Sequence, residues 1–184
     1  SNYGIKFKAK RALESYKTSR GKIIAKPAIA KGVAYILDDT NNLSAFSLSS
    51  KKVLWRTKLT QQDRDFHPNK GGVAYSDGRL YVTNGSRDLM VLEAATGREL
   101  FRKSFGDITS NIPLIIGNQI VVIQTNDNQV LAFDMDNARL KWASNGGDGI
   151  ITVKNHFSPV NIYGDILASY SSGEIVMIDG ESGK

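Results

Sequence analysis

Apolar residues occur in this chain as short runs, each closed by turn-forming residues. The stretch "GGVAYSDGRLYVTNGSRDLMVLEAATGREL" at 71–100 shows this pattern, with Asp-Gly and Asn-Gly-Ser between its apolar runs. Apolar and polar residues alternate in "LSAFSL" at 43–48 and "IVMID" at 175–179, which is typical of strands with two different faces. Gly, Asn and Asp interrupt helical patterns, and only 8–16 could hold a helical turn or two. The pattern therefore predicts an all-β protein.

The pattern recurs four times along the chain. Copies at 26–55, 71–101, 112–142 and 158–184 align on one small or apolar position late in each copy. The aligned residues are 46, 41 and 45 residues apart; they are Ala45, Val91, Ala132 and Met177. A period in the forties is the length of a four-stranded propeller blade. We therefore expect a β-propeller of four-stranded antiparallel blades, with about four blades present.

Two further positions repeat at fixed distances beyond the aligned residue. The first, a turn position, holds glycine in two copies, and glycine allows the positive φ that a tight turn can demand. The second, ten residues beyond the aligned residue, is aromatic and should lie on the outermost strand, between neighbouring blades. We expect a structural role for these residues, which are Trp55, Phe101, Trp142, Gly97 and Gly183.

The repeats define the expected organisation of the chain. A basic segment at 1–26, which could belong to a flanking blade, precedes the propeller at 27–184. The blades are expected at 27–59, 71–105, 112–144 and 158–184. The last blade lacks an outer strand, because its aromatic residue would fall at position 187. We therefore expect a fragment of a larger propeller, in which residues 1–20 or another chain could supply the missing strand. An open propeller exposes a strand edge and apolar faces, which favours self-association.

Composition excludes several classes of function. The chain has no cysteine, so disulfides, thiol catalysis and cysteine-based zinc or haem sites are excluded. No apolar run approaches the roughly 20 residues that cross a bilayer as a helix. The net charge is +6, but residues 1–26 hold eight basic residues and one acidic residue, so the remaining 158 residues carry −1. This distribution disfavours a nucleic-acid-binding face. Near a membrane, the basic segment could approach anionic headgroups.

The repeat resembles that of the pyrroloquinoline quinone (PQQ)-like propellers, and within that group the BamB family of outer-membrane protein assembly factors. The resemblance lies in "GRLYV", "VLEAATGREL" and "SPVNIYGDILASYSSGEIVMIDGESGK" and covers about 27–184. It implies an eight-bladed, non-enzymatic scaffold at the periplasmic face of the outer membrane, anchored by a lipidated cysteine upstream. The implied partners are the POTRA domains of BamA and unfolded outer-membrane proteins, and no cofactor is implied.

The resemblance also implies a docking loop between two blades. In the family, an apolar-x-apolar-basic sequence ends five residues before the proline that begins the next blade. Ile151, Val153 and Lys154 stand at this distance before Pro159. The family usually has arginine at the basic position, and lysine lacks its bidentate fork. These three residues are the predicted partner-binding site.

Two other functions compete with a scaffold in outer-membrane assembly. One is a quinoprotein dehydrogenase that binds PQQ and Ca²⁺, for which candidate oxygen ligands exist at Asp38, Asp39, Asn41, Asn42, Asn126, Asp127 and Asn128. Such clusters between strands are normally turns, so we predict no metal site and no catalytic residue. The other is a propeller scaffold with an unrelated partner. Hydrolysis is disfavoured, because His67 and His156 are 89 residues apart and no nucleophile elbow is present.

Overall fold

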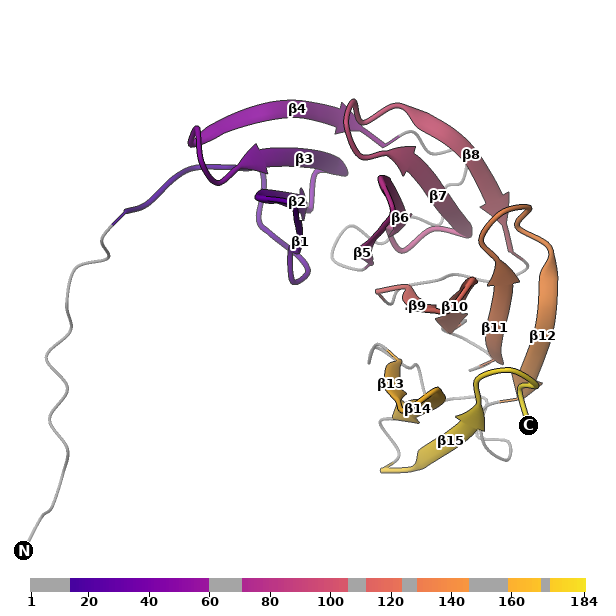
Figure 1. The fold of residues 1–184 in the computed structure, drawn as a ribbon. Helices are drawn as coiled ribbons and strands as arrows, with labels where there is room; N and C mark the ends of the chain where they lie inside the picture. The colour runs from indigo at the N-terminus through magenta and orange to yellow at the C-terminus, as the bar shows by residue number, and fades with distance from the viewer. Residues whose placement is uncertain (1–13, 60–70, 106–111, 124–128, 146–158, 170–172) are drawn as a thin grey trace, which may run out of the picture.

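A computed structural model describes residues 14–59, 71–105, 112–123, 129–145, 159–169 and 173–184. Within these ranges the chain contains strands and no helix, and the strands form four separate antiparallel sheets. The predicted all-β propeller fold is therefore confirmed. In Figure 1 the four sheets follow one another along an open arc.

Each sheet is a blade whose strands pair in chain order. Blade 1 consists of β1 (Ala28–Ala30), β2 (Val33–Leu37), β3 (Asn42–Ser47) and β4 (Lys52–Lys58). Blade 2 consists of β5 (Gly72–Ser76), β6 (Arg79–Thr83), β7 (Asp88–Glu93) and β8 (Glu99–Ser104). Blade 3 consists of β9 (Leu114–Ile116), β10 (Gln119–Ile123), β11 (Gln129–Asp134) and β12 (Leu140–Asn145). Blade 4 has three strands in the described residues, which are β13 (Val160–Ile162), β14 (Asp165–Ser169) and β15 (Ile175–Asp179).

The blades are arranged around a common centre. The first strands β5 and β9 lie on the inner side of the arc, and the fourth strands β4, β8 and β12 lie on its outer side (Figure 1). First strands of successive blades contact one another, β1 with β5, β5 with β9 and β9 with β13. Each sheet has a leading face, which we define as the face toward the next blade, and a trailing face toward the preceding blade.

The aligned small or apolar residues of the four repeats occupy equivalent places. Ala45 pairs with Trp55, Val91 with Phe101 and Ala132 with Trp142, between the third and fourth strands of their blades. The register of each pair of strands shifts directly after the aligned residue, so a β-bulge recurs three times at the same place. Met177 holds the same place in β15, opposite Leu167.

Burial of apolar faces between blades holds the arc together. Tyr35 and Ala45 on the leading face of blade 1 pack with Leu80 and Met90 on the trailing face of blade 2. Equivalent clusters fill the next two junctions, between blades 2 and 3 and between blades 3 and 4. Because side chains alternate across a strand, each sheet supplies one apolar face to each neighbour. A single blade cannot cover both of its own faces.

The turn that follows the third strand contains a residue with a left-handed backbone in every blade. Its φ angles are +60° at Lys51, +77° at Gly97, +56° at Ala138 and +74° at Gly183. A side-chain oxygen at the end of the preceding strand stabilises three of these turns, where Ser47, Asp134 or Asp179 accepts hydrogen bonds from backbone N–H groups of the turn. The turn residues of the sequence therefore have a local function in closing each hairpin.

Candidate functional site at the blade junctions

The junction between blades 1 and 2 is built on Trp55. Its indole Nε1 donates a hydrogen bond of 2.9 Å to the Ala94 carbonyl of blade 2. The Thr57 hydroxyl donates one of 3.0 Å to the Gly97 carbonyl in the same turn. Gly97 lies flat against the ring, because a Cβ there would be 2.5 Å from Trp55 Cε3. Glycine is therefore required at position 97 both by its φ and by the space that Trp55 occupies.

Trp142 forms the corresponding junction between blades 3 and 4. A Cβ at Gly183 would lie 2.5 Å from Trp142 Cε3, as at the first junction. The indole Nε1 donates to Gln119 Oε1 at 3.1 Å and to the Gly180 carbonyl at 3.3 Å. Gln119 is buried and donates from Nε2 to the same carbonyl at 2.9 Å. The amide and the indole together satisfy the buried polar groups at this junction.

The middle junction differs from the other two in both of its partners. Phe101 stands where the other junctions have tryptophan, and Ala138 stands where the others have glycine. Phenylalanine has no N–H to donate to the neighbouring blade. The residue corresponding to Gln119 is Arg79, the first residue of β6. These exchanges make the junction between blades 2 and 3 chemically distinct.

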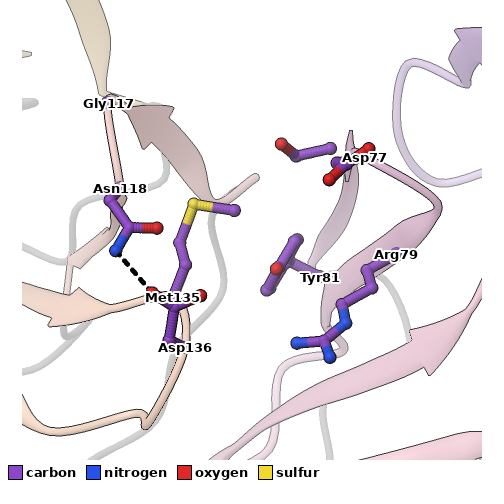
Figure 2. Close-up of a pocket in the computed structure, with 8 residues that line it drawn as sticks. Asp77, Arg79, Tyr81, Gly117, Asn118, Met135 and Asp136 are labelled. Atoms are coloured by element: carbon purple, nitrogen blue, oxygen red, sulfur yellow. Dashed lines mark hydrogen bonds between the residues drawn. The ribbon is translucent and has the colours of Figure 1, made fainter.

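A cavity of about 400 Å³ lies at this middle junction. Figure 2 shows Asp77, Arg79 and Tyr81 of blade 2 facing Asn118 and Asp136 of blade 3 across it. The Asn118 amide donates a hydrogen bond of 2.9 Å to an Asp136 carboxylate oxygen. Tyr81 is 1% exposed, and burial raises the pKa of its phenol, although a hydrogen bond and positive charge from Arg79 oppose this shift. The cavity could bind a small polar or cationic group, because two carboxylates outnumber one guanidinium.

A polar network ties the loops of blades 1 and 2 together. The Asp38 carboxylate accepts hydrogen bonds from the Thr40 hydroxyl at 2.6 Å and from the Thr40, Asn42, Arg20 and Gly21 backbone N–H groups. Burial raises the pKa of the Asp38 carboxyl, but the hydrogen bonds lower it by more, so the pKa lies below its ordinary value. Across the junction, the Asn84 amide donates to Asn41 Oδ1 at 3.0 Å.

This network bears on the candidate metal ligands of the sequence. Both Asp38 oxygens are occupied by protein donors, so the carboxylate closes a turn and holds the segment at 20–21 against blade 1. Asn126, Asp127 and Asn128 lie outside the described residues. Within the described ranges, no three histidine, aspartate or glutamate side chains form a group that could hold a metal ion.

The outer strand of blade 2 carries a partly buried ion-pair network. Arg102 Nη1 contacts Asp88 Oδ2 at 2.9 Å, and Arg102 Nη2 contacts Glu99 Oε1 at 2.6 Å. Burial lowers the pKa of the Arg102 guanidinium, but the two carboxylates raise it by more. Arg56, at the same place in blade 1, donates instead to Ser44 Oγ at 3.0 Å and to the Thr18 carbonyl at 3.2 Å. The arginine at this position of the fourth strand therefore contacts the third strand of its own blade in both blades, and Arg56 also contacts the segment before blade 1.

The structure places the predicted site residues unequally. Trp55, Phe101 and Trp142 lie on the fourth strands, and Gly97 and Gly183 lie in the turns of the following blades. Ile151, Val153 and Lys154 lie outside the described residues and remain a prediction. His67 and His156 also lie outside them. The sequence pattern does not predict the cavity at Arg79 and Tyr81. None of the described residues forms a helix of the length and apolarity that crossing a membrane requires.

The blades and their junctions define a β-propeller of PQQ-like repeats. The family model for the outer membrane protein assembly factor BamB matches residues 41–184. The chain therefore belongs to the BamB family.

Relatives with curated sequences are longer than this chain. An uncharacterized protein of Rickettsia conorii is 30% identical over 171 residues, which are 93% of this chain and 41% of that protein. The outer membrane protein assembly factor BamB of Burkholderia pseudomallei is 23% identical over 175 residues, covering 89% of this chain and 41% of that protein. The chain thus spans about two fifths of the length of the curated relatives it matches.

Solved structures agree on the fold. BamB from Moraxella catarrhalis superposes with a TM-score of 0.68 at 12% identity, over 90% of this chain and 51% of that chain. Quinohemoprotein alcohol dehydrogenase from Comamonas testosteroni superposes with a TM-score of 0.71 at 16% identity, over 89% and 34%. The computationally designed Ika4 protein superposes with a TM-score of 0.69 at 13% identity, over 92% and 98%. At these identities the likeness concerns the fold alone.

Proposed function

We propose that the chain belongs to a non-enzymatic scaffold of the machinery that assembles and inserts β-barrel proteins into the outer membrane. In this proposal the propeller docks to the periplasmic POTRA domains of BamA and aids delivery of unfolded barrel precursors. It acts at the periplasmic face of the outer membrane, where a lipid anchor holds the full-length protein. The single observation that carries the proposal is membership of the BamB family over residues 41–184.

The chemistry of the described junctions supports a scaffold. Trp55, Trp142 and Gln119 donate hydrogen bonds to neighbouring blades, and the Asp38 carboxylate accepts hydrogen bonds from the backbone N–H groups of Gly21 and Thr40. These groups fix the blades relative to one another, which lets loops between blades present side chains at defined positions. A rigid platform of this kind suits the binding of a folded partner domain.

The proposed docking contact is the sequence at 151–154. Ile151 and Val153 would bury apolar surface against the partner, and Lys154 would form a charge-assisted hydrogen bond with an acidic group.

A quinoprotein dehydrogenase is the second candidate, because a quinohemoprotein dehydrogenase shares the fold. Asp38, Asp39, Asn41 and Asn42 are the described candidates for a calcium ligand. The Asp38 carboxylate among them is already occupied by protein donors, and this favours the scaffold.

Binding to the periplasmic region of BamA tests the proposal. The chain is expected to bind immobilised BamA periplasmic region, and Ile151→Asp and Lys154→Glu are each expected to weaken binding about tenfold or more, which is about 1.4 kcal/mol. Lys141→Glu is the matched control, because Lys141 is an exposed lysine on β12 of the preceding blade. Undiminished binding of both loop variants would remove the site assignment. Failure of the unmodified chain to bind would remove the function itself, and a bound quinone absorbance would favour the dehydrogenase.

A further inference from the structure

The cavity between blades 2 and 3 has a buried floor and a charged rim. Tyr81 and Met135, which are 1% and 8% exposed, form the floor. Asp77, in the turn before β6, and Asp136, in the turn after β11, are exposed at the rim. Figure 2 shows the two aspartates on opposite sides of the cavity, one in each blade. The volume of about 400 Å³ is within the range of pockets that hold small molecules, which is about 300–1,000 Å³.

Arg79 adds one positive charge to the wall of this cavity. It is the first residue of β6, and its side chain is half-buried. In the parts of the chain that the structure describes, Arg79, Asp77 and Asp136 take part in no ion pair. One guanidinium and two carboxylates therefore face the same space, and each can form a charge-assisted hydrogen bond with a ligand.

The Tyr81 hydroxyl brings a buried donor to the floor of the cavity. Arg79 donates a hydrogen bond to the phenol oxygen. Burial raises the pKa of the phenol, Arg79 lowers it, and the charges of Asp136 and Asp77 raise it, so both carboxylates act on this oxygen. Within the described ranges, the hydroxyl hydrogen of Tyr81 has no acceptor. A buried donor without an acceptor costs free energy, so the floor favours a ligand that brings an acceptor oxygen.

The same junction lacks a cross-blade contact that the other two junctions have. Trp55 and Trp142 each donate an indole hydrogen bond to a carbonyl of the following blade. Phe101 has no such donor, and the hydrogen bond from Asn118 to Asp136 stays within blade 3. A ligand that contacts Asp77 and Asp136 at once would join blades 2 and 3 at this place.

A second cavity, of about 430 Å³, lies between blades 3 and 4 and provides a comparison within the same chain. Lys141 and Glu181 give its lining one charge of each sign. The buried Gln119 amide in its wall already bonds Trp142 and the Gly180 carbonyl. This cavity therefore has neither the excess of carboxylates nor the open buried donor of the first.

We infer that the cavity between blades 2 and 3 binds a free α-amino acid with a cationic side chain. The carboxylate of the ligand pairs with the Arg79 guanidinium and accepts a hydrogen bond from the Tyr81 hydroxyl. Its α-ammonium group and its side-chain cation pair with Asp77 and Asp136. The charges match, because the ligand carries two positive charges and one negative charge and the cavity carries the reverse. Met135 packs on the aliphatic part of the side chain.

This inference goes beyond the proposed function and does not depend on it, because the proposed docking contact uses none of these residues. The bound amino acid joins the two blades, so it is also expected to stabilise the folded chain. Ligands that bind only the folded state raise its stability as their concentration rises above the dissociation constant.

Isothermal titration calorimetry on the unmodified chain gives the first test. L-lysine and L-arginine are the probes, and a dissociation constant of about 1 mM or tighter is expected. Norleucine, which lacks the side-chain ammonium, and L-lysine methyl ester, which lacks the carboxylate, are each expected to bind about tenfold more weakly or worse. Binding of neither basic amino acid, or equal binding of L-lysine and norleucine, would overturn the inference.

Variants of the lining residues test the assigned contacts. Arg79→Gln is suitable because Gln119 occupies the same place in β10 of the next blade. In this variant the difference in affinity between L-lysine and its methyl ester should disappear. Asp136→Asn should weaken L-lysine binding about tenfold or more. Glu181→Gln is the matched control, because Glu181 lines the second cavity and should leave the affinity unchanged.

Two results with these variants would overturn the inference. The first is an equal loss of affinity in Glu181→Gln and Asp136→Asn, because this would show attraction to surface charge alone. The second is an undiminished preference of Arg79→Gln for L-lysine over its methyl ester, because the guanidinium would then not hold the carboxylate.

Discussion

A methyl group added at Gly97 probes the junction between blades 1 and 2 directly. Gly97 has a φ of +77°, and an added Cβ would lie 2.5 Å from both Trp55 Cε3 and Thr57 Oγ1. A left-handed backbone costs a residue other than glycine about 1–2 kcal/mol. Forcing an extra methyl group into a packed site costs about 1–3 kcal/mol more. Gly97→Ala is therefore expected to lower the free energy of unfolding by about 2–5 kcal/mol.

The matched control is Gly78→Ala in the turn between β5 and β6. Gly78 has a φ of +79°, but no atom lies within 4 Å of its added Cβ. It carries the backbone cost of about 1–2 kcal/mol and not the cost of the contact. Urea unfolding followed by far-UV circular dichroism, at one protein concentration, compares the two. Equal losses for Gly97→Ala and Gly78→Ala would refute the assigned contact with Trp55.

A double-mutant cycle separates the ring contact from other effects. Trp55→Phe alone loses the hydrogen bond to the Ala94 carbonyl, at about 1 kcal/mol, and leaves a small cavity. In the Gly97→Ala background the smaller ring makes room for the methyl group, and the next junction carries phenylalanine and alanine at the same two positions. The loss of unfolding free energy in the double variant should therefore be smaller than the sum of the two single losses by about 1 kcal/mol or more. Strict additivity would show that the ring and the methyl group do not meet.

Three other predictions follow from the polar contacts. Asp38→Asn is expected to destabilise the chain by about 1–3 kcal/mol at neutral pH. The pKa of Asp38 is lowered in the folded state, so its contribution to the free energy of unfolding is complete above the ordinary carboxyl pKa of about 3.9. This contribution is lost as pH falls through the folded pKa. The urea midpoints of the unmodified chain and of Asp38→Asn should therefore converge between pH 7 and pH 3. Arg102→Leu should lower the free energy of unfolding by about 2–4 kcal/mol, because it leaves the Asp88 carboxylate partly buried without its cation. The double variant Arg102→Leu with Asp88→Asn should recover part of this loss in thermal unfolding. Equal melting temperatures for the single and double variants would contradict this reasoning. Asn84→Ala should cost about 1–3 kcal/mol through the Asn41 contact across the junction, whereas Asn118→Ala, whose hydrogen bond is exposed, should change the urea midpoint little.

Some features of this protein follow from local pattern. Strand positions follow from two-residue alternation, and blade period follows from the spacing of Ala45, Val91, Ala132 and Met177. The exact ends of the strands do not follow from local pattern, as in β1, which runs from Ala28 to Ala30. Hydrogen bonds to the neighbouring strand fix such ends, and the neighbour is not local in sequence.

Other features depend on which blades meet. The sequence alone places Trp55, Phe101 and Trp142 at one repeated position, but it does not reveal that only two of them cover a glycine and donate an indole N–H. Nor does it reveal that Tyr16, which lies outside the recognised repeats, packs against Phe46 and Lys51 of blade 1. The candidate docking residues Ile151, Val153 and Lys154 rest on the family pattern alone.

The sequence by itself thus determined the strands, their turns and their repetition, because alternation and left-handed turns are local properties of the chain. Only the tertiary structure decided how the junctions differ and which side chains line the cavity between blades 2 and 3. These depend on side chains about 40 residues apart meeting across neighbouring sheets, as Trp55 meets Ala94, and on the space each pair leaves. The local sequence pattern does not specify that space, because it is defined only when neighbouring sheets pack together.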